Sequence, residues 1–506
     1  MEINYFDLSG GINQSLTKTE LGLDTKNLYW ADSKNVEIFE NKGIRKQKGN
    51  TLLFELPESD GITSMREMEC DDIYKLVVTT LSGKIYIYQE NSSNLILLEK
   101  TLSGKNVKMV PFLRGMLVST ESDPLFYIKN NEYYEVENCN LIDSHGQNII
   151  PQCIETYRGR VWCSCGSTVY YSALGTYNDF IQESDAGYIN DFYTDTADIT
   201  ALASYKDYLA IYKKERVYLL SGSSPEDFAI IPFADKGAYA DSAVVNVDNK
   251  QYFLSSGIYA LEQVGELNQI RLGSEISKNI SSEFSKINQN RISSAIALHY
   301  QNNHQMWFLF PYNNDNYFHT IWINDYVNHS WYKRVLPQNI TYAAIFHNNV
   351  ISADSEGHVY KEYTGSTFNG AIIDFMWKSP FLSFNHPHHR KMIDEFYFVL
   401  DDNYDNRFLF SVYKDFDENY CEDKERIYAR RLNQLTWADD SMNDNPDCFW
   451  PTDDSNIPVW AIGADNIEKA EICGSSYSVQ LCVEGHNIDD NCSIIGLQFR
   501  EIYNDD

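Results

Sequence analysis

The sequence predicts an all-β protein, with a β-propeller of six or seven blades followed by a C-terminal β-sandwich-like domain. The first observation is composition, because 14% of the 506 residues are aromatic and such residues favour strands. The second is a recurring hairpin, in which a polar or glycine turn precedes a β-branched or aromatic run, as in LSGKIYIYQE at 81–90. The third is the regular spacing of this hairpin along the chain.

The repeating unit reads as strand, polar turn, strand, turn, strand, and a more polar fourth strand often follows. The aromatic residue of the third strand recurs at Tyr86, Phe126, Tyr170, Tyr218, Tyr259, Trp322 and Tyr360. Periods of about 40–50 residues with four strands each are typical of β-propellers. Such sheets bury both faces only when they are stacked around an axis, so we expect a closed ring.

Two departures from the rhythm have simple interpretations. The long interval before Trp322 predicts a loop insertion that contains a helix-like segment at 274–286. The segment 35–54 is a hairpin that turns at 41–43, and we expect it to complete the last blade by pairing the N-terminal part of the chain with the final strands.

The predicted domains are an N-terminal arm and closing segment at 1–34, the propeller at 35–368, and an all-β domain at 369–506. In the last domain, strands are expected near 372–384, 391–401, 407–413, 459–462, 476–483 and 493–503. The final strand alternates apolar and polar residues, as half-buried strands do. An acidic loop at 415–458 separates the two groups of strands.

The net charge of −31 argues against tight binding to nucleic-acid phosphates or to an anionic membrane surface. No apolar run reaches the length of a membrane span, and the N-terminus lacks the basic and apolar segments of a secretory signal. The ten cysteines match no zinc-binding spacing and are interpreted as reduced thiols of a product made in a cytosol.

Several groups of residues are candidate sites, and each has a structural interpretation that we favour. Cys163 and Cys165 would point to the same face of a strand, where they would pack against a neighbouring blade. His386, His388 and His389 form a histidine cluster, but spacing alone does not establish a metal site. The acidic loop carries carboxylates suited to calcium, without the glycine turn and closing glutamate of a hand-type loop. These carboxylates are Asp439, Asp440, Asp444, Asp447, Asp453 and Asp454.

The segment Ser352–Tyr360, SADSEGHVY, is similar to the Asp-box hairpin of sialidase propellers. It has one extra residue before Gly357, lacks the Thr-Trp pair, and occurs once, so we interpret it as a turn between blade strands. No nucleophile elbow, phosphate-binding loop, zinc-protease motif or dinucleotide fingerprint is present. The sequence therefore predicts no catalytic residue, no cofactor and no metal, and we expect that the protein is not an enzyme.

Three stretches in order resemble the tail nozzle or hub proteins of short-tailed bacteriophages, known as tail tubular protein B or stabilisation protein. The first carries Gly10-Gly11-Ile12-Asn13, then Asn35, Gly43-Ile44-Arg45-Lys46 and Gly49. The second, residues 157–180, carries Ser172, Gly175 and Phe180. The third, residues 377–393, carries Trp377-Lys378, Pro380, Phe384 and Arg390-Lys391. Residues 415–470 match no part of the family pattern.

The resemblance implies a structural virion protein that is made in the host bacterial cytoplasm and located in the virion tail. It implies self-association into a ring, usually of six copies, below the phage portal and adaptor ring proteins. The ring would line the DNA ejection channel and dock tail fibres or a plug protein. Genomic DNA would pass through an acidic lumen without specific binding, and no membrane insertion is expected.

Two other classes of function stay open at this point. A carbohydrate-binding or glycan-cleaving propeller, acting as a receptor-binding tail component, would need a central pocket with paired carboxylates or stacked aromatic side chains. A host scaffold propeller of the WD type would need repeated Trp-Asp endings on third strands. The nearest such stretch, Trp437-Ala438-Asp439, lies outside the repeats.

Overall fold

The computed structural model describes residues 2–23, 27–39, 42–70, 73–90, 94–135, 141, 147–181, 183, 185–264, 269–401, 403–429 and 467–505. The chain forms two compact units. One is continuous, Lys48–Ala371, and the other combines Met1–Gln47 with Ile372–Asp506. The continuous unit is therefore inserted into the sequence of the other.

The continuous unit consists of seven four-stranded antiparallel sheets, which establishes seven blades. Blade 1 comprises β8 (Ile62–Cys70), β9 (Ile73–Thr80), β10 (Lys84–Gln89) and β11 (Asn94–Thr101). Blade 2 comprises β12 (Lys108–Phe112), β13 (Gly115–Ser119), β14 (Phe126–Lys129) and β15 (Glu132–Glu135). Blade 3 comprises β16 (Cys153–Tyr157), β17 (Arg160–Cys165), β18 (Thr168–Tyr171) and β19 (Gly187–Ile189). Blade 4 comprises β20 (Ile199–Tyr205), β21 (Tyr208–Lys213), β22 (Val217–Ser221) and β23 (Ala229–Ala234).

The remaining blades follow the same plan. Blade 5 comprises β24 (Val244–Val247), β25 (Lys250–Leu254), β26 (Ile258–Val264) and β27 (Gln269–Leu272). Blade 6 comprises β28 (Ile296–Tyr300), β29 (Gln305–Leu309), β30 (Thr320–Asp325) and β31 (Ser330–Val335). Blade 7 comprises β32 (Ile340–Phe346), β33 (Asn349–Asp354), β34 (His358–Glu362) and β7 (Asn50–Glu55). The predicted insertion before Trp322 contains the short helix α2 (Ser281–Phe284) and the 3₁₀ turns η4 (Lys278–Ile280) and η5 (Ile292–Ser294).

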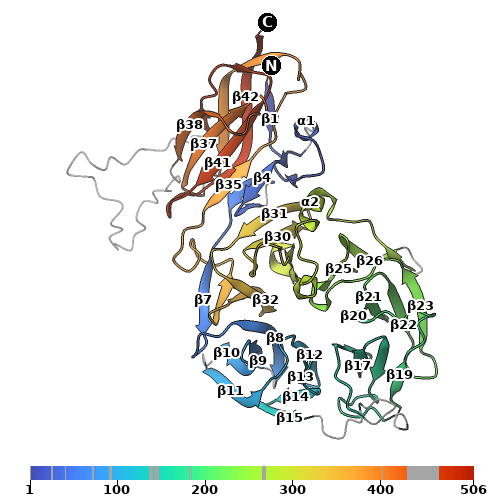
Figure 1. Ribbon diagram of the computed structural model, residues 1–506. Coiled ribbons are helices and arrows are strands. Elements are labelled where there is room, and N and C mark those ends of the chain that lie inside the picture. The colour runs from blue at the N-terminus through green and yellow to red at the C-terminus, as the bar shows by residue number, and fades with distance from the viewer. Residues whose placement is uncertain are drawn as a thin grey trace, which may run out of the picture. The chain divides into compact units, whose positions relative to one another are not determined.

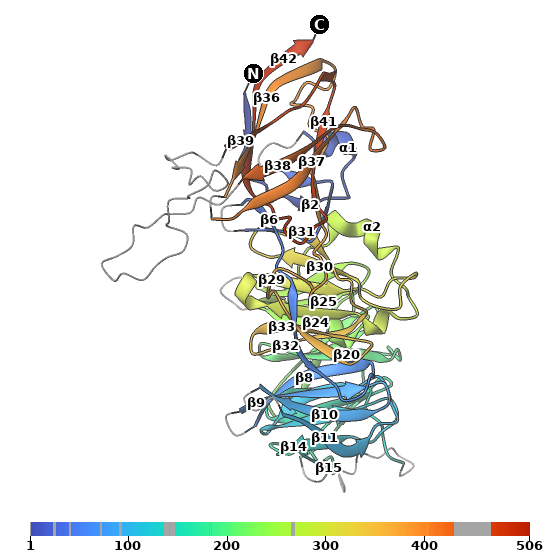
Figure 2. The ribbon, with the colours of Figure 1, turned by 90° about the vertical axis from the view of Figure 1, so that its left-hand side faces the viewer.

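The first strands of the blades form a closed ring around the propeller axis (Figure 1). Each contacts the first strand of the next blade, and β32 of blade 7 contacts β8 of blade 1. The view from the side shows the blades of this unit stacked on one another (Figure 2). Hydrophobic clusters fill the space between neighbouring blades; one joins Met68, Val77 and Ile85 of blade 1 to Met116, Val118 and Phe126 of blade 2. Burial of both sheet faces, as expected from the repeat, therefore holds the ring together.

The ring is closed by β7, which pairs with β34 as the outermost strand of blade 7. Pairing sets His358 opposite Glu55 and Glu362 opposite Asn50. The chain enters this strand through Gly49, where a Cβ atom would lie 1.8 Å from the carbonyl oxygen of Thr367. Only glycine permits this close approach of two backbone segments.

A buried ion pair holds the same crossing point. Arg334 of β31 and Glu362 of β34 are both fully buried, and Nε and Nη2 of the arginine lie 3.0 and 2.5 Å from Oε2 of the glutamate. The guanidinium also donates to the carbonyl oxygens of Lys48 and Gly49, at 2.8 and 3.0 Å. Oε1 of Glu362 accepts a hydrogen bond from the amide of Asn50 at 3.1 Å. The ion pair therefore ties β31 of blade 6 and β34 of blade 7 to the start of β7.

The second unit is a β-sandwich, as predicted. One sheet has the order β39-β36-β42-β6-β5, with β1 beside β42 and β40 beside β36; the other has the order β38-β37-β41-β35-β4. Their bounds are β1 (Ile3–Tyr5), β4 (Asp32–Lys34), β5 (Val36–Ile38), β6 (Ile44–Lys46), β35 (Phe375–Lys378), β36 (Arg390–Leu400), β37 (Asn406–Lys414), β38 (Cys421–Ala429), β39 (Ile467–Ala470), β40 (Ser475–Ser476), β41 (Val479–Gly485) and β42 (Ser493–Asp505). The parallel pair β2 (Gly11–Ile12) and β3 (Tyr29–Trp30) and the helix α1 (Lys18–Leu21) also belong to this unit.

Phenylalanine side chains from both sheets form the sandwich core. The ring of Phe396 stacks on that of Phe410 with centroids 5.4 Å apart, and Phe398 meets Phe408 edge-on at 5.3 Å. Both pairs join a residue of β36 in one sheet to a residue of β37 in the other, and the two strands can be followed in Figure 2. The alternation of Phe396, Phe398 and Leu400 places all three on one face of the strand, which is the buried face.

The structure divides the chain differently from the sequence-based expectation. The hairpin of β5 and β6 adds to the sandwich sheet through pairing of Ser493 and Ile494 with Arg45 and Ile44. Of the predicted closing segment 35–54, only the end, 50–54 in β7, completes the last blade. The propeller therefore begins at Lys48 rather than 35, and residues 1–34 supply sandwich strands rather than a separate arm. Of the predicted acidic loop 415–458, residues 415–420 form a turn and loop, and 421–429 form the strand β38. Residues 430–458 lie outside the described residues, as does the predicted strand 459–462.

We expect substitution Arg334→Met to destabilise the propeller by about 3–5 kcal/mol, because Glu362 would stay buried without its counter-charge. Thermal and urea unfolding would measure the loss. Arg216→Met is the matched control: that side chain is 51% exposed, and its ion pair with Asp235 should contribute less than about 1 kcal/mol. Replacing both partners with Met and Leu should recover part of the loss, and a single variant as stable as the wild type would contradict the role of the pair.

Candidate functional site

The propeller axis is the first candidate site. The first strands of all seven blades enclose a cavity of about 560 Å³ in this channel. Its charged lining comes from three successive blades and the turn before β24: Arg66 and Glu67 from β8, Lys108 from β12, Glu155 from β16, and Asp241 from η3 (Asp241–Ala243). Apart from the adjacent Arg66 and Glu67, these residues are far apart in the sequence, so only closure of the ring assembles them.

The charges in the channel partly compensate one another. Nζ of Lys108 lies 3.4 Å from Oδ2 of Asp241, and their side chains are only 13% and 18% exposed. The carboxyl of Glu155 is largely removed from solvent in the channel, and this burial raises its pKa to about 7. The backbone N–H of Thr156 and the charge of Arg66 oppose the rise in pKa, while the carboxylate of Asp241 adds to it.

The size of the channel limits what it can hold. A cavity of this volume is in the range of small-molecule sites. Duplex DNA, whose major groove alone is about 12 Å wide, does not fit inside it. A path for DNA therefore cannot run along the axis of a single propeller.

A second cavity of about 650 Å³, here called the mouth cavity, lies next to the channel. The two cavities share Val107, Lys108, Ser242 and Tyr342 as lining residues, so they are adjacent. The mouth cavity is lined by loops and strand ends from blades 1, 2, 5, 6 and 7. Its cationic residues are Lys105, Lys108 and Arg291, and its one carboxylate is Glu121.

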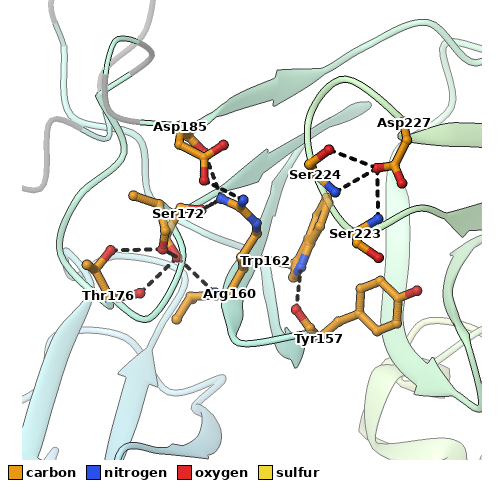
Figure 3. Close-up of polar contacts among 11 residues, drawn as sticks. Tyr157, Arg160, Trp162, Ser172, Thr176, Asp185, Ser223, Ser224 and Asp227 are labelled. Carbon is orange, nitrogen blue, oxygen red and sulfur yellow. Dashed lines mark hydrogen bonds and ion pairs between the residues drawn. The ribbon is translucent and has the colours of Figure 1, made fainter.

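The stretch at 157–180, which resembles the phage family, forms a network of polar contacts in blade 3 (Figure 3). Arg160, 2% exposed, donates from Nη2 to Oδ2 of Asp185 at 2.6 Å and from Nη1 to the carbonyl oxygen of Ser172 at 2.9 Å. The hydroxyl of Ser172 accepts from the N–H of Val161 at 2.9 Å and lies 2.8 Å from the carbonyl oxygen of Thr176. Ser172 therefore fixes the loop that follows β18.

The two other family-like residues of this stretch also have roles in folding. Gly175 has a φ of +73°, which favours glycine, and its N–H donates to the carbonyl oxygen of Gly159 at 2.8 Å. Phe180 is buried in the hydrophobic cluster between blades 2 and 3. The motif thus shapes a loop and anchors it between blades, and it presents no reactive group.

Sequence reasoning missed the equivalent loop of blade 4, which follows β22. There, Oδ1 of Asp227 accepts from the N–H groups of Ser223 and Ser224, at 2.8 and 2.6 Å (Figure 3). The ring of Phe228 packs against that of Trp162 in blade 3, with centroids 5.3 Å apart. The signal was present, because a serine followed by an Asp-Phe pair ends both third-strand loops, at 172–180 and 221–228.

The cysteine pair and the Asp-box-like turn have the structural roles we expected. Cys163 is buried, and Cys165 packs partly buried against the same cluster between blades 2 and 3. Oδ1 of Asp354 accepts from the N–H groups of Glu356 and His358 at 2.9 Å, which closes the turn between β33 and β34. Oδ2 of Asp354 accepts from the hydroxyl of Tyr360 at 2.9 Å.

The histidine cluster lies in the loop before β36. The rings of His386 and His389 are 6.4 Å apart at their centroids, and Nζ of Lys391 donates to the carbonyl oxygens of both residues at 2.7 Å. In the described parts of the chain, no group of three or more His, Cys, Asp or Glu side chains is arranged to hold a metal ion. The six aspartates of the acidic loop, Asp439 to Asp454, and the Trp437-Ala438-Asp439 stretch lie outside the described residues.

Comparisons with known proteins leave the family open. No family model matches the chain, and no curated protein matches it. Among solved structures, it is similar to YCF48 bound to D1 peptide, with 11% identity, a TM-score of 0.40, and coverage of 62% of this chain and 94% of that one. It is also similar to the computationally designed Ika8 protein, with 12% identity, a TM-score of 0.35, and coverage of 62% and 100%. These similarities are too low to support an inference about function. No helix among the described residues is long and apolar enough to cross a membrane.

The raised pKa of Glu155 predicts that this residue lowers the stability of the folded protein at high pH. Because its pKa is about 7 in the folded state and 4.5 when unfolded, the group favours folding most below pH 4.5 and loses that contribution as the pH rises through 7. Glu155→Gln, which is neutral at every pH, should therefore be more stable than the wild type at pH 8 by about 1–3 kcal/mol, allowing for solvent in the channel.

Melting temperatures of both proteins between pH 4 and pH 8 would test this expectation. The difference should vanish at the acidic end of the range. The control is Glu215→Gln in the exposed turn between β21 and β22, which should show no such trend. A constant difference across the pH range would contradict the assignment.

Proposed function

We propose that this chain is a structural component of the tail of a short-tailed bacteriophage. In this proposal about six copies form a nozzle or hub ring below the portal and adaptor rings, and the ring docks fibres or a plug protein. The proposal depends on two observations. Three stretches of this chain resemble the nozzle family in the same order, and this chain folds into a propeller and a sandwich. The protein would act by shape and charge rather than by catalysis.

The observation that carries the proposal is the blade 3 network. The family-like residues Ser172, Gly175 and Phe180 each make a distinct contact in this loop. Another chain with the same loop would need the same residue types at these positions. A loop of the same kind in the nozzle family would support a common architecture.

Charge supports a passive conduit between copies. Six copies at −31 each would carry −186, and an acidic wall has no tendency to hold phosphates. Since the channel of one propeller is too small for duplex DNA, we place the conduit on the ring axis, outside the individual propellers. DNA would then slide past like-charged surfaces during ejection.

A carbohydrate-binding propeller is the second candidate, and the mouth cavity is the observation that favours it. The cavity has the size of a small-ligand site and is lined by aromatic and hydroxyl side chains. A receptor-binding role and a ring-forming role are compatible in one tail protein.

Assembly is the test of the first proposal. Purified protein, alone and mixed with the adaptor and portal proteins of the same phage, should give closed rings of about six copies in negative-stain images. The ring should not retain duplex DNA at physiological salt, measured by fluorescence anisotropy. An unrelated seven-bladed propeller with a similar charge is the control for both measurements. A protein that stays monomeric with every partner would contradict the proposal.

A further inference from the structure

The mouth cavity combines positive charge with unused hydrogen-bonding groups. In a chain of net charge −31, its lining has three cationic residues and one carboxylate. That carboxylate, Glu121, is already engaged, because its two oxygens accept from the backbone N–H groups of Lys105 and Asn106 at 3.1 and 2.7 Å. The carboxylate is thus held against the backbone, and the lining keeps an excess of cationic over anionic residues.

The three cations differ in how they are held. Arg291 donates from its two terminal nitrogens to the carbonyl oxygens of Asp315 and Asn316, at 2.9 and 2.8 Å, which fixes the loop before β30. Lys108 is held at the junction with the channel by Asp241, which lines the channel and not the mouth cavity. Lys105 is exposed, and within the described chain its ammonium group forms no hydrogen bond or ion pair. The cavity thus offers one free cation and two fixed ones.

Neutral polar groups surround these charges without partners of their own. In the part of the chain that the structure describes, no side-chain hydrogen bond is formed by a further set of lining residues. They are Asn106, Ser293, Asn316, Tyr317 and Tyr342. Polar groups that converge on a cavity and have no protein partner are available to a ligand. Two of the five are tyrosines, whose rings can also pack against a sugar face.

We propose that the mouth cavity binds an anionic saccharide, that is, a sugar that carries a carboxylate or a phosphate. The cations would pair with the oxyanion, and the amides, hydroxyls and tyrosines would contact the ring and its hydroxyl groups. A volume of about 650 Å³ accommodates one or two sugar rings and excludes a nucleic-acid duplex. The site is independent of ring assembly, because every lining residue belongs to one propeller.

The test uses the full-length protein and four probes: glucuronate, glucose 6-phosphate, glucose and inorganic phosphate. Isothermal titration calorimetry should detect both anionic sugars at millimolar concentration. Glucose lacks the charge and phosphate lacks the ring, so each should bind at least about tenfold more weakly.

Lys105→Glu is the informative variant, since the side chain is exposed and its replacement breaks no contact. It should weaken binding of the anionic sugars at least about tenfold. Lys206→Glu is the matched control: it makes the same change of charge in the turn between β20 and β21, away from the cavity, and should alter binding less than about twofold.

Each contrary outcome is decisive. The proposed site would be overturned if the Lys105→Glu and wild-type proteins bound the anionic sugars with equal affinity. It would also be overturned if calorimetry detected no binding of either anionic sugar. Binding of inorganic phosphate as tight as that of glucose 6-phosphate would reduce it to a simple anion site and overturn the saccharide assignment. If glucose bound as tightly as the anionic sugars, charge would have no part in recognition, and the anionic assignment would be overturned. None of these results bears on whether the protein forms rings.

Discussion

The Arg334–Glu362 ion pair holds the point at which the chain both enters and leaves the propeller. It ties the carbonyl groups of Lys48 and Gly49, at the start of β7, to strands β31 and β34. The exit segment lies beside the entry segment, where Asn50 bridges to Phe368. A buried ion pair adds little net stability over an apolar pair, but it strongly penalises any arrangement that separates its partners. Its contribution is therefore to specify which strand closes the ring.

Closure has consequences for the interior as well as for the rim. Only a closed ring brings Lys108 and Asp241 together, since they come from blades on different sides of the axis and are far apart in sequence. The mouth cavity depends on the same condition, because its lining comes from five blades. If β7 left blade 7, the first strands could separate and both cavities would open to solvent. The candidate site is thus a property of the ring and not of any blade.

Much of the fold could be predicted from the sequence, because each blade repeats a local pattern. The third-strand aromatics, from Tyr86 to Tyr360, all lie in the third strand of their blade. The short outer strands β19 and β27 are not predicted from the sequence, because three or four residues are too few to show an alternating pattern. The hairpin of β5 and β6 was given to the wrong sheet because an alternating hairpin can add to any exposed edge, and the choice depends on tertiary contacts.

The candidate site was less predictable for a related reason. Most residues that line the channel lie on first strands, and polar residues such as Glu155 are not distinguished by sequence from polar residues of other strands. The family-like motif pointed to residues 157–180, and the structure gives them roles in shaping a loop. The motif therefore located a loop with specific contacts, whereas the cavities depend on the positions of the blades.

The order of the two units along the chain also constrains folding. The sandwich strands β1 and β4 to β6 are made first, yet their partners β35 and β42 follow the whole propeller. Likewise β7 precedes the other strands of its blade by most of the ring. Both units therefore depend on contacts of very long sequence separation, which form slowly and leave sheet edges unpaired in the meantime. A strong and specific attachment at the crossing point, such as the Arg334 network, favours capture of β7 by its own ring over pairing with another chain.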